Sequence, residues 1–287
     1  MKLSGTIKAP DGPSAWTSEI GRWIAFGNIT GLNINGRGLF DGNGQKWWDQ
    51  SCKHHPGKDC SERAPTAVSF IQCSNAHINE IYVERSPQVH VVVDYSQDVH
   101  FKSLIINSPE TSPNTDGIHI AHSHDVSVHT SVIAAGDDCI SISDQTSNIS
   151  VTYVNCGPGH GISIGSLGKN GEEVKVENIT VRHVNFYKTT NGARIKTWQG
   201  ASYDGAMVQA GIPDFWLIAI ISHHVLDQEI TKHDEGAVNF LTDIGLGLMI
   251  LSWKRHIKAA LKYFYHEDLD KDEDKGKKKS SPVDAQG

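Results

Sequence analysis

Three short cassettes carry the residues of this chain that are best suited to acid–base chemistry. In each, an ionisable residue precedes alternating aliphatic residues: Thr115-Asp116-Gly117-Ile118-His119-Ile120, Asp137-Asp138-Cys139-Ile140-Ser141-Ile142 and Gly159-His160-Gly161-Ile162-Ser163-Ile164. Asp116 and Asp138 are 22 positions apart (138 − 116), and His160 lies 22 positions further on (160 − 138). Asp137 adds a third carboxyl group. Crowded carboxylates raise one another's pKa, so one can stay protonated as an acid beside an ionised base.

The spacing of the cassettes predicts the element that positions them. A fixed period of about 22 residues with strand-like alternation is typical of a parallel β-helix, in which each period forms one coil. Equivalent residues on neighbouring coils stack at the strand spacing of roughly 4.8 Å. We therefore expect Asp116, Asp138 and His160 to form a ladder on one face, with Asp137 beside it. The alternating isoleucines should stack inward as aliphatic ladders.

A second repeated phrase extends this pattern along the chain. It has a polar corner followed by alternating apolar residues, as at Ser74-Asn75, Ser123-His124-Asp125, Ser147-Asn148 and Glu177-Asn178. Glycine, with 27 residues, is abundant, as expected of a chain that turns a corner several times per coil. Between Leu3 and Trp198 we expect about seven coils.

Four motifs in order resemble the signature motifs of a known family. They are Asn114-Thr115-Asp116, Gly136-Asp137-Asp138, Gly159-His160-Gly161 and Arg194-Ile195-Lys196, and they resemble those of the polygalacturonases, the pectin-cleaving glycoside hydrolases. The sequence from Cys156 to Gly168 is similar to that of the plant branch of the family. The resemblance runs from about Leu3 to about Gly205. It implies an all-β fold, a right-handed parallel β-helix, and hydrolysis of the α-1,4 bonds between galacturonic acid residues with inversion. No Cys/His cluster fits zinc, and we expect no cofactor and no metal.

The resemblance also implies roles for the ionisable residues. Asp137 would be the general acid, while Asp116 and Asp138 would orient and deprotonate a water molecule. In inverting enzymes the acid and the base lie roughly 6.5–9.5 Å apart, which leaves room for that water. His160 would contact the substrate or tune the acid, and a purely structural histidine is the alternative.

The basic motif and the remaining polar residues complete the expected site. Arg194 and Lys196 alternate about Ile195, so both should face one groove and bind the carboxylates of an acidic sugar. The alternative is a surface pair that balances the acidic ladder. Asn114 would help to shape the cleft. Other histidines, such as His54, His55, His119 and His124, follow no ligand spacing and are expected to be solvated.

Five cysteines are compatible with two disulfides and one thiol, or with five buried thiols. The resemblance implies a bridge between Cys139 and Cys156 beside the active site, on adjacent coils. Cys52 and Cys60 flank a polar loop and could close it. The fifth cysteine is Cys73.

The net charge and the terminal segments indicate which partners and which location to expect. A net charge of −7 argues against a nucleic-acid surface, so an acidic polymer must be bound by a local basic patch. The apolar run Ile244–Trp253 is too short to cross a bilayer, and we expect a monomer that acts on pectin. Met1–Gly5 lacks the apolar region of a signal peptide. Because members of the resembled family are secreted to the cell wall, this start is expected to be internal to a longer precursor. The alternative is that the protein is not exported.

The character of the chain changes after about Val208, which predicts three regions. They are a truncated β-helix over residues 1–205, a helical appendage over 206–265 that opens at Gly211–Ala219, and a charged disordered tail over 266–287. The segment Gly211–Ile244 resembles part of the nucleosome assembly proteins, which are acidic histone chaperones, and this implies a histone-type partner for that segment alone.

Two other functions compete with hydrolysis. A calcium-dependent pectate lyase also uses a β-helix and an acidic sugar, although paired aspartates followed by Gly159-His160-Gly161 suit hydrolysis better. The other is a non-enzymatic, catalytically impaired solenoid that binds pectin, because a β-helix without its terminal coils exposes an apolar end and unpaired strand edges.

Overall fold

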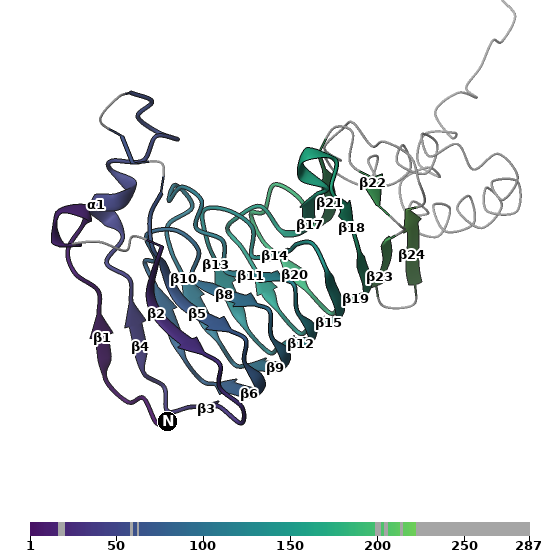
Figure 1. Cartoon of the computed structure of the whole chain (residues 1–287), viewed down its shortest axis with the longest axis horizontal. Coiled ribbons are helices and arrows are strands. Elements are labelled where there is room, and N and C mark those ends of the chain that lie inside the picture. The colour runs from purple at the N-terminus through teal and green to yellow at the C-terminus, as the bar shows by residue number, and fades with distance from the viewer. Residues whose placement is uncertain are drawn as a thin grey trace, which may run out of the picture. The chain divides into compact units, whose positions relative to one another are not determined.

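Short alternating segments recur along the chain, and each forms a strand in the computed structural model (Figure 1). The structure describes residues 1–16, 21–57, 60–61, 63–198, 202–203, 206–212 and 215–221. All of these residues belong to one unit, Met1–Gly236.

Most strands fall into three sheets, numbered here in the order in which the chain enters them. Sheet 1 consists of β1 (Thr6–Lys8), β4 (Leu39–Asp41), β7 (Tyr82–Glu84), β10 (Ile105–Asn107), β13 (Val132–Ala134), β16 (Asn155–Cys156) and β20 (Asn185–Phe186). Sheet 2 consists of β2 (Arg22–Gly27), β5 (Thr66–Ile71), β8 (Val91–Asp94), β11 (Ile118–Ala121), β14 (Ile140–Ile142), β17 (Ile162–Leu167) and β21 (Ala193–Thr197). Sheet 3 consists of β3 (Asn33–Ile34), β6 (Ser74–Asn79), β9 (Gln97–Lys102), β12 (His124–His129), β15 (Thr146–Thr152), β19 (Val176–Arg182), β23 (Ala206–Ile212) and β24 (Phe215–Ile221).

The other described elements are short. They are the helix α1 (Gln45–Trp48), the 3-10 turns η1 (Pro13–Ala15) and η2 (Lys169–Gly171), and the paired strands β18 (Glu173–Val174) and β22 (Ser202–Tyr203).

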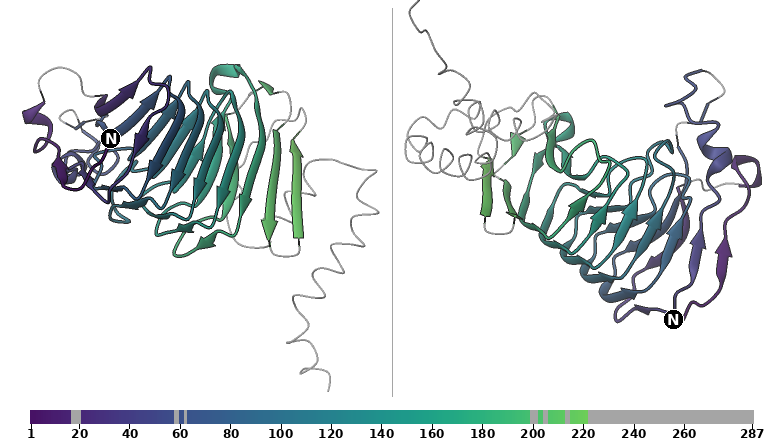
Figure 2. Two further views of the ribbon diagram at one scale, coloured as in Figure 1. Left: turned by 90° about the horizontal axis from the view of Figure 1, so that it is seen from below. Right: turned by 180° about the vertical axis from the view of Figure 1, so that it is seen from behind.

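The chain visits the three sheets in turn, so that each circuit makes one coil of a right-handed parallel β-helix (Figure 2). Within the described residues, 7 strands of sheet 1 and 7 of sheet 2 correspond to seven coils, as the repeat predicts. Neighbouring strands within each sheet pair in parallel register, apart from the last pair of sheet 3. The solenoid architecture expected from the sequence is confirmed.

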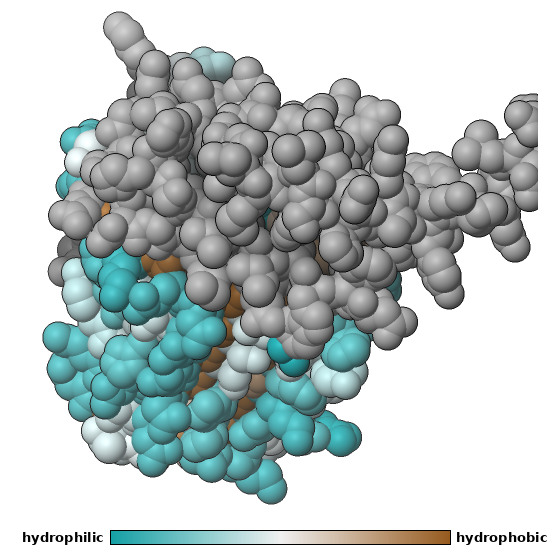
Figure 3. Space-filling model, turned by 90° about the vertical axis from the view of Figure 1, so that its right-hand side faces the viewer, coloured by the Kyte–Doolittle hydropathy of each residue, from teal (hydrophilic) through white to brown (hydrophobic). Residues whose placement is uncertain are grey.

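The interior is built from the aliphatic ladders that the alternation predicts. Ile118, Ile140 and Ile162 are paired in register on sheet 2, and all three are buried. Burying each such side chain stabilises the fold by roughly 1.5–3 kcal/mol. In Figure 3, the part of the end face that is not grey shows apolar side chains between flanks of hydrophilic ones. A one-residue slip would move the aliphatic ladder to the surface, so this core also fixes the register.

The polar corners of the repeat have a backbone reason. Asn75, Asp98, Asp125, Asn148 and Asn178 open successive strands of sheet 3 with φ between 52° and 58°, the left-handed region that Asn and Asp tolerate. Three of them also bond to one another, because Asn178 Nδ2 donates to Asn148 Oδ1 at 2.7 Å and Asn148 Nδ2 donates to Asp125 Oδ1 at 2.9 Å. The corners therefore stack like the strands that they begin.

The expected helix at Gly211–Ala219 is wrong. β23 pairs in parallel with β19 and continues sheet 3 beyond the expected boundary at Gly205, and β24 then pairs antiparallel to β23. A short apolar run such as Phe215–Ile221 fits a buried helix or a strand equally well, and the unpaired edge of β19 decides for the strand. The rest of the expected appendage, residues 222–265, and the expected tail, residues 266–287, lie outside the described residues.

Candidate active site

The strand register brings the three ionisable residues together. Ile118 of β11 pairs with Ile140 of β14, which pairs with Ile162 of β17. The residues two positions before each, Asp116, Asp138 and His160, therefore occupy one rung position on three neighbouring coils. The expected ladder is confirmed.

Glycines let the turns that carry these residues approach one another closely. A Cβ added to Gly136 would lie 1.9 Å from the carbonyl oxygen of Ser112, and the Gly136 N–H donates to Thr115 Oγ1 at 2.9 Å. A Cβ on Gly161 would lie 2.3 Å from the carbonyl oxygen of Asn191, and its φ of 91° is strained for other residues. The glycines of the motifs are therefore requirements of coil packing.

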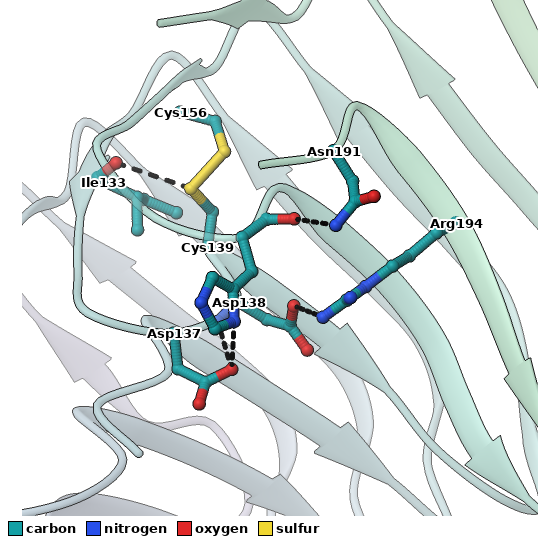
Figure 4. Close-up of a disulfide and its surroundings, with 8 residues drawn as sticks. Ile133, Asp137, Asp138, Cys139, Cys156, Asn191 and Arg194 are labelled. Carbon is teal, nitrogen blue, oxygen red and sulfur yellow. Dashed lines mark hydrogen bonds and ion pairs between the residues drawn. A yellow bond between two sulfur atoms is a disulfide. The ribbon is translucent and has the colours of Figure 1, made fainter. Parts of the chain in front are cut away.

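Asp138 is a buried carboxylate with two cationic partners. Arg194 Nη2 donates to its Oδ1 at 2.8 Å, as Figure 4 shows, and Lys196 Nζ donates to its Oδ2 at 2.9 Å. The Asp138 side chain is 2% exposed, and those of Arg194 and Lys196 are 9% and 20% exposed. Removing one partner of a buried ion pair typically costs about 3–5 kcal/mol, so these contacts are also structural.

Asp137 lies beside Asp138 but has different partners. His160 Nδ1 donates to Asp137 Oδ1 at 2.9 Å, and Lys53 Nζ donates to Asp137 Oδ2 at 3.2 Å. Burial raises the pKa of Asp137, but the hydrogen bond and charge of His160 and the charge of Lys53 outweigh it, so the pKa lies below its usual value. The hydrogen bond to Asp137 in turn raises the pKa of His160. Asp137 is therefore ionised in this arrangement.

Asp116 is the carboxyl group of the cluster whose pKa is raised. Burial first, and then the charges of Asp137 and Asp138, raise the pKa of Asp116 to about 7, against a hydrogen bond from Ser141 that lowers it. Ser141 Oγ donates to Asp116 Oδ2 at 2.7 Å. His90, which is fully buried, holds the Asp116 backbone, with its Nδ1 2.8 Å from the Asp116 carbonyl oxygen.

The remaining predicted residue also lies at the cluster. Asn114 Oδ1 accepts a hydrogen bond from Lys53 Nζ at 3.1 Å. The structure thus brings together every residue that the motifs singled out, on the same flank of sheet 2: Asn114, Asp116, Asp137, Asp138, His160, Arg194 and Lys196.

Both expected disulfides are present. Cys139 and Cys156 are bridged with their Cα atoms 5.9 Å apart, directly beside Asp138 (Figure 4). Cys52 and Cys60 close the polar loop with their Cα atoms 4.8 Å apart, and Cys73 is a buried thiol. The interpretation as five thiols is excluded.

Sequence reasoning missed Lys53 and misjudged His119. His119 is only partly exposed: its Nδ1 lies 2.8 Å from Ser141 Oγ, and Ser141 in turn bonds to Asp116. Register could have found it, because His119, Ser141, Ser163 and Arg194 are paired along one row of sheet 2. No such signal exists for Lys53, which is 84 residues before Asp137 in the sequence. His54, His55 and His124 are exposed, as expected.

Among the described residues, Asp137, Asp138 and His160 form the group whose ligand atoms lie close enough for a metal, within 4.8 Å of one another. Lys53, Arg194 and Lys196 already contact these carboxylates, and their positive charges oppose a bound cation. The donor set thus fits acid–base chemistry on an anionic substrate better than a metal centre. In the described part of the chain, no helix has the length and apolar content needed to span a membrane.

Comparison with known proteins gives two family matches. Glycosyl hydrolases family 28 matches residues 1–210, and the nucleosome assembly protein (NAP) family matches residues 165–268. The second match is wider than the segment Gly211–Ile244 expected from the sequence. Its described residues between 165 and 198 form coils of the β-helix.

Individual relatives agree with the first match. A polygalacturonase of Arabidopsis thaliana is 44% identical over 200 residues, which are 70% of this chain and 45% of the relative. The solved polygalacturonase of Erwinia carotovora is 28% identical, with a TM-score of 0.61 over 71% of this chain and 59% of that one. The endo-xylogalacturonan hydrolase of Aspergillus tubingensis is 27% identical, with a TM-score of 0.63 over 74% of this chain and 57% of that one. The chain spans 45% of the length of this Arabidopsis relative and 44% of that of a polygalacturonase of Persea americana.

Proposed function

The chain belongs to glycosyl hydrolases family 28, and from that membership we propose that its β-helix hydrolyses the α-1,4 bonds between galacturonic acid residues in pectin. The observation that carries this proposal is the cluster of Asp116, Asp137 and Asp138 with cations on two of its three carboxyl groups. Such a cluster provides both an acid and a base within one site.

We assign the acid role to Asp137 and the activation of water to Asp116 and Asp138. Both carboxylate oxygens of Asp138 already accept hydrogen bonds from Arg194 and Lys196, so we assign it the orientation of the water. Asp116 accepts a proton from this water, while Asp137 gives its own proton to the departing glycosidic oxygen. Turnover then ends with a proton on Asp116 and none on Asp137, which is the protonation state that the substrate-free cluster favours.

The substrate-binding residues follow from charge and position. Arg194 and Lys196 bring two positive charges to a chain whose net charge is −7, and they suit a polymer that carries a carboxylate on every sugar. His160, about one third exposed, can donate to the substrate or hold Asp137. Asn114 lies at the same cluster and helps to shape the cleft.

The experiment is an assay for new reducing ends on polygalacturonate, with and without a chelator of divalent cations. Hydrolysis should be unaffected by the chelator, and proton NMR should show that the first product has the anomeric configuration opposite to that of the cleaved bond. An unsaturated, ultraviolet-absorbing product that disappears with the chelator would instead establish a calcium-dependent lyase. When carboxyl groups of the site are substituted, Asp98→Asn at an exposed corner of sheet 3 serves as the control for loss of a carboxylate far from the site.

We further propose that the protein works as a monomer outside the cell, in the wall where pectin lies. Two disulfides, Cys52–Cys60 and Cys139–Cys156, suit an oxidising compartment. Detection of the protein in wall extracts, at a monomer's size by light scattering, tests both statements. Its confinement to the cytosol would contradict the first.

A further inference from the structure

A loop closed by a disulfide places Lys53 at the candidate site, although Lys53 is 84 residues before Asp137 in the sequence. The loop follows α1, whose Trp47 and Trp48 are buried, and Trp48 Nε1 donates to the carbonyl oxygen of Ser86 at 3.1 Å. The Cys52–Cys60 bridge closes the loop. These contacts fix the base from which Lys53 extends.

Lys53 is the most accessible of the cationic side chains around the carboxylates. Its side chain is 44% exposed, against 9% for Arg194 and 20% for Lys196. Its ammonium group bridges Asp137 Oδ2 and Asn114 Oδ1, at 3.2 and 3.1 Å. Arg194 and Lys196 are anchored on buried Asp138, whereas the more exposed Lys53 can change partners by giving up its contacts with Asp137 and Asn114.

This contact opposes protonation of Asp137. The groups that face Asp137 are Lys53 from the loop, His160 from the next coil, and the carboxyl groups of Asp116 and Asp138. His160 and Lys53 donate to its two carboxylate oxygens and hold its pKa below the usual value. Loss of one of these two contacts would favour the protonated form that a general acid needs.

We propose that Lys53 is a substrate-binding residue that changes partners: its ammonium group leaves Asp137 for a carboxylate of the galacturonan chain, and Asp137 then takes up a proton from Asp116. The inference rests on the proposed hydrolysis. An acidic sugar offers the ammonium group a carboxylate in place of the one it gives up, so the charge of the lysine stays compensated throughout.

The proton count closes over one turnover. On binding, one proton moves from Asp116 to Asp137, which leaves Asp116 ionised as the base. Asp137 then protonates the departing oxygen, and Asp116 takes one proton from the attacking water. After product release Lys53 returns to Asp137, and the site is again in its substrate-free state.

Steady-state kinetics of the full chain on trigalacturonate test the exchange. Lys53→Met should raise KM by about tenfold to a hundredfold, as expected for loss of a charge-assisted contact, while kcat changes less than KM. Lys53→Arg should restore most of the affinity. The matched control is Lys46→Met, which removes the same charge from α1, where Lys46 pairs only with exposed Asp11 among the described residues.

The pH profile adds a readout that a merely structural lysine would not move. Without Lys53, the substrate-free Asp137 keeps its proton to higher pH, so the basic limb of kcat/KM should shift upward in Lys53→Met and not in Lys46→Met. A KM and a basic limb that match those of the control would overturn the proposal.

Measuring trigalacturonate binding shows whether the partner exchange of Lys53 or the proposed hydrolysis is wrong. If the wild-type chain binds trigalacturonate without cleaving it, and Lys53→Met binds it tenfold more weakly or worse, then hydrolysis fails and the lysine contact stands. If the wild-type chain cleaves it and Lys53→Met behaves like Lys46→Met, the exchange fails and hydrolysis stands. A wild-type chain that neither binds nor cleaves it contradicts both.

Discussion

At the scale of single residues, the candidate site places three carboxyl groups in three different surroundings. Asp138 is buried against Arg194 and Lys196, Asp137 is held by His160 and Lys53, and Asp116 has a serine hydroxyl as its side-chain hydrogen-bond partner. Only the third lacks a cation in contact, and burial together with the neighbouring carboxylates raises its pKa to about 7. Under the proposed mechanism, Asp137 must gain a proton and Asp116 must lose one before the two can act as acid and base.

We expect Asp137→Asn to abolish hydrolysis of polygalacturonate while leaving binding largely intact. An amide fits the site but cannot donate a proton with the strength of a carboxylic acid, and general acids contribute typically about 10²–10⁴-fold to the rate. Reducing-end assays and calorimetric binding on the same preparation provide the measurement, with Asp98→Asn as the matched control. Hydrolysis that survives the substitution would remove Asp137 from the acid role.

We expect Asp116→Asn to change the pH dependence of stability. The pKa of Asp116 is raised from 3.8 to about 7 on folding, so its contribution to stability is fully present below pH 3.8 and is lost as the pH rises through about 7. At pH 8 the substitution should therefore stabilise the fold relative to its effect at pH 4, by roughly 1–4 kcal/mol. Denaturant unfolding at the two pH values measures this. An equal effect at both would show that Asp116 ionises as readily in the folded chain as in the unfolded one.

At the scale of elements, both turns and strands position the residues of the candidate site. The register of β11, β14 and β17 stacks the ionisable residues, and glycines at the preceding turns allow the coils to touch. The Cys139–Cys156 bridge joins adjacent coils next to Asp138. If one of these turns moves, the carboxyl group that the turn carries therefore moves with it.

We expect Gly161→Ala to be strongly destabilising and Gly192→Ala to be nearly neutral. Alanine at 161 would meet carbonyl oxygens at 2.3 Å in a left-handed backbone, whereas at 192 the nearest atom is Phe186 at 3.9 Å. The first change should cost at least about 2 kcal/mol and the second under about 1 kcal/mol. Chemical denaturation of both variants, together with activity at a permissive temperature, measures the difference. Equal losses would contradict the close approach of the coils at Gly161.

At the scale of the whole molecule, the described β-helix continues beyond the last site residue. β23 pairs with β19 through Ile179–Val208 and the three residue pairs that follow, and β24 covers the other edge of β23. Unpaired edges of this length promote association between chains. The residues assigned to the site therefore end at Lys196, whereas the pairing of sheet 3 continues through β23 to β24.

We expect a chain ending at residue 205 to unfold at lower temperature and to aggregate faster than one ending at residue 221. The shorter chain loses β23 and β24 and exposes the edge of β19, whereas every residue assigned to the site is retained in both. Thermal unfolding and light scattering compare the two, and trigalacturonate binding reports on the site. Identical stability would show that β23 contributes nothing to sheet 3.

Much of the fold and of the candidate site could be predicted from the sequence, because a solenoid repeats itself. The equal spacing of Asp116, Asp138 and His160 predicts that they occupy equivalent positions on successive coils. Polar corner residues such as Asn148 indicate turns with a left-handed backbone. The paired cysteines Cys139 and Cys156 followed from the resemblance and are bridged. Local periodicity carries this information, and a parallel β-helix is almost entirely local in its repeat.

The tertiary structure alone decided what depends on contacts across the repeat. Lys53 reaches Asp137 from a loop outside the periodic pattern, and no spacing could reveal a contact across 84 residues. Phe215–Ile221 is apolar throughout, so periodicity could not distinguish a helix from a strand, and the edge of sheet 3 settled it. The opposite pKa shifts of Asp116, which is raised, and Asp137, which is lowered, also depend on the tertiary structure, because a pKa is set by burial and by the charges that surround a group in space.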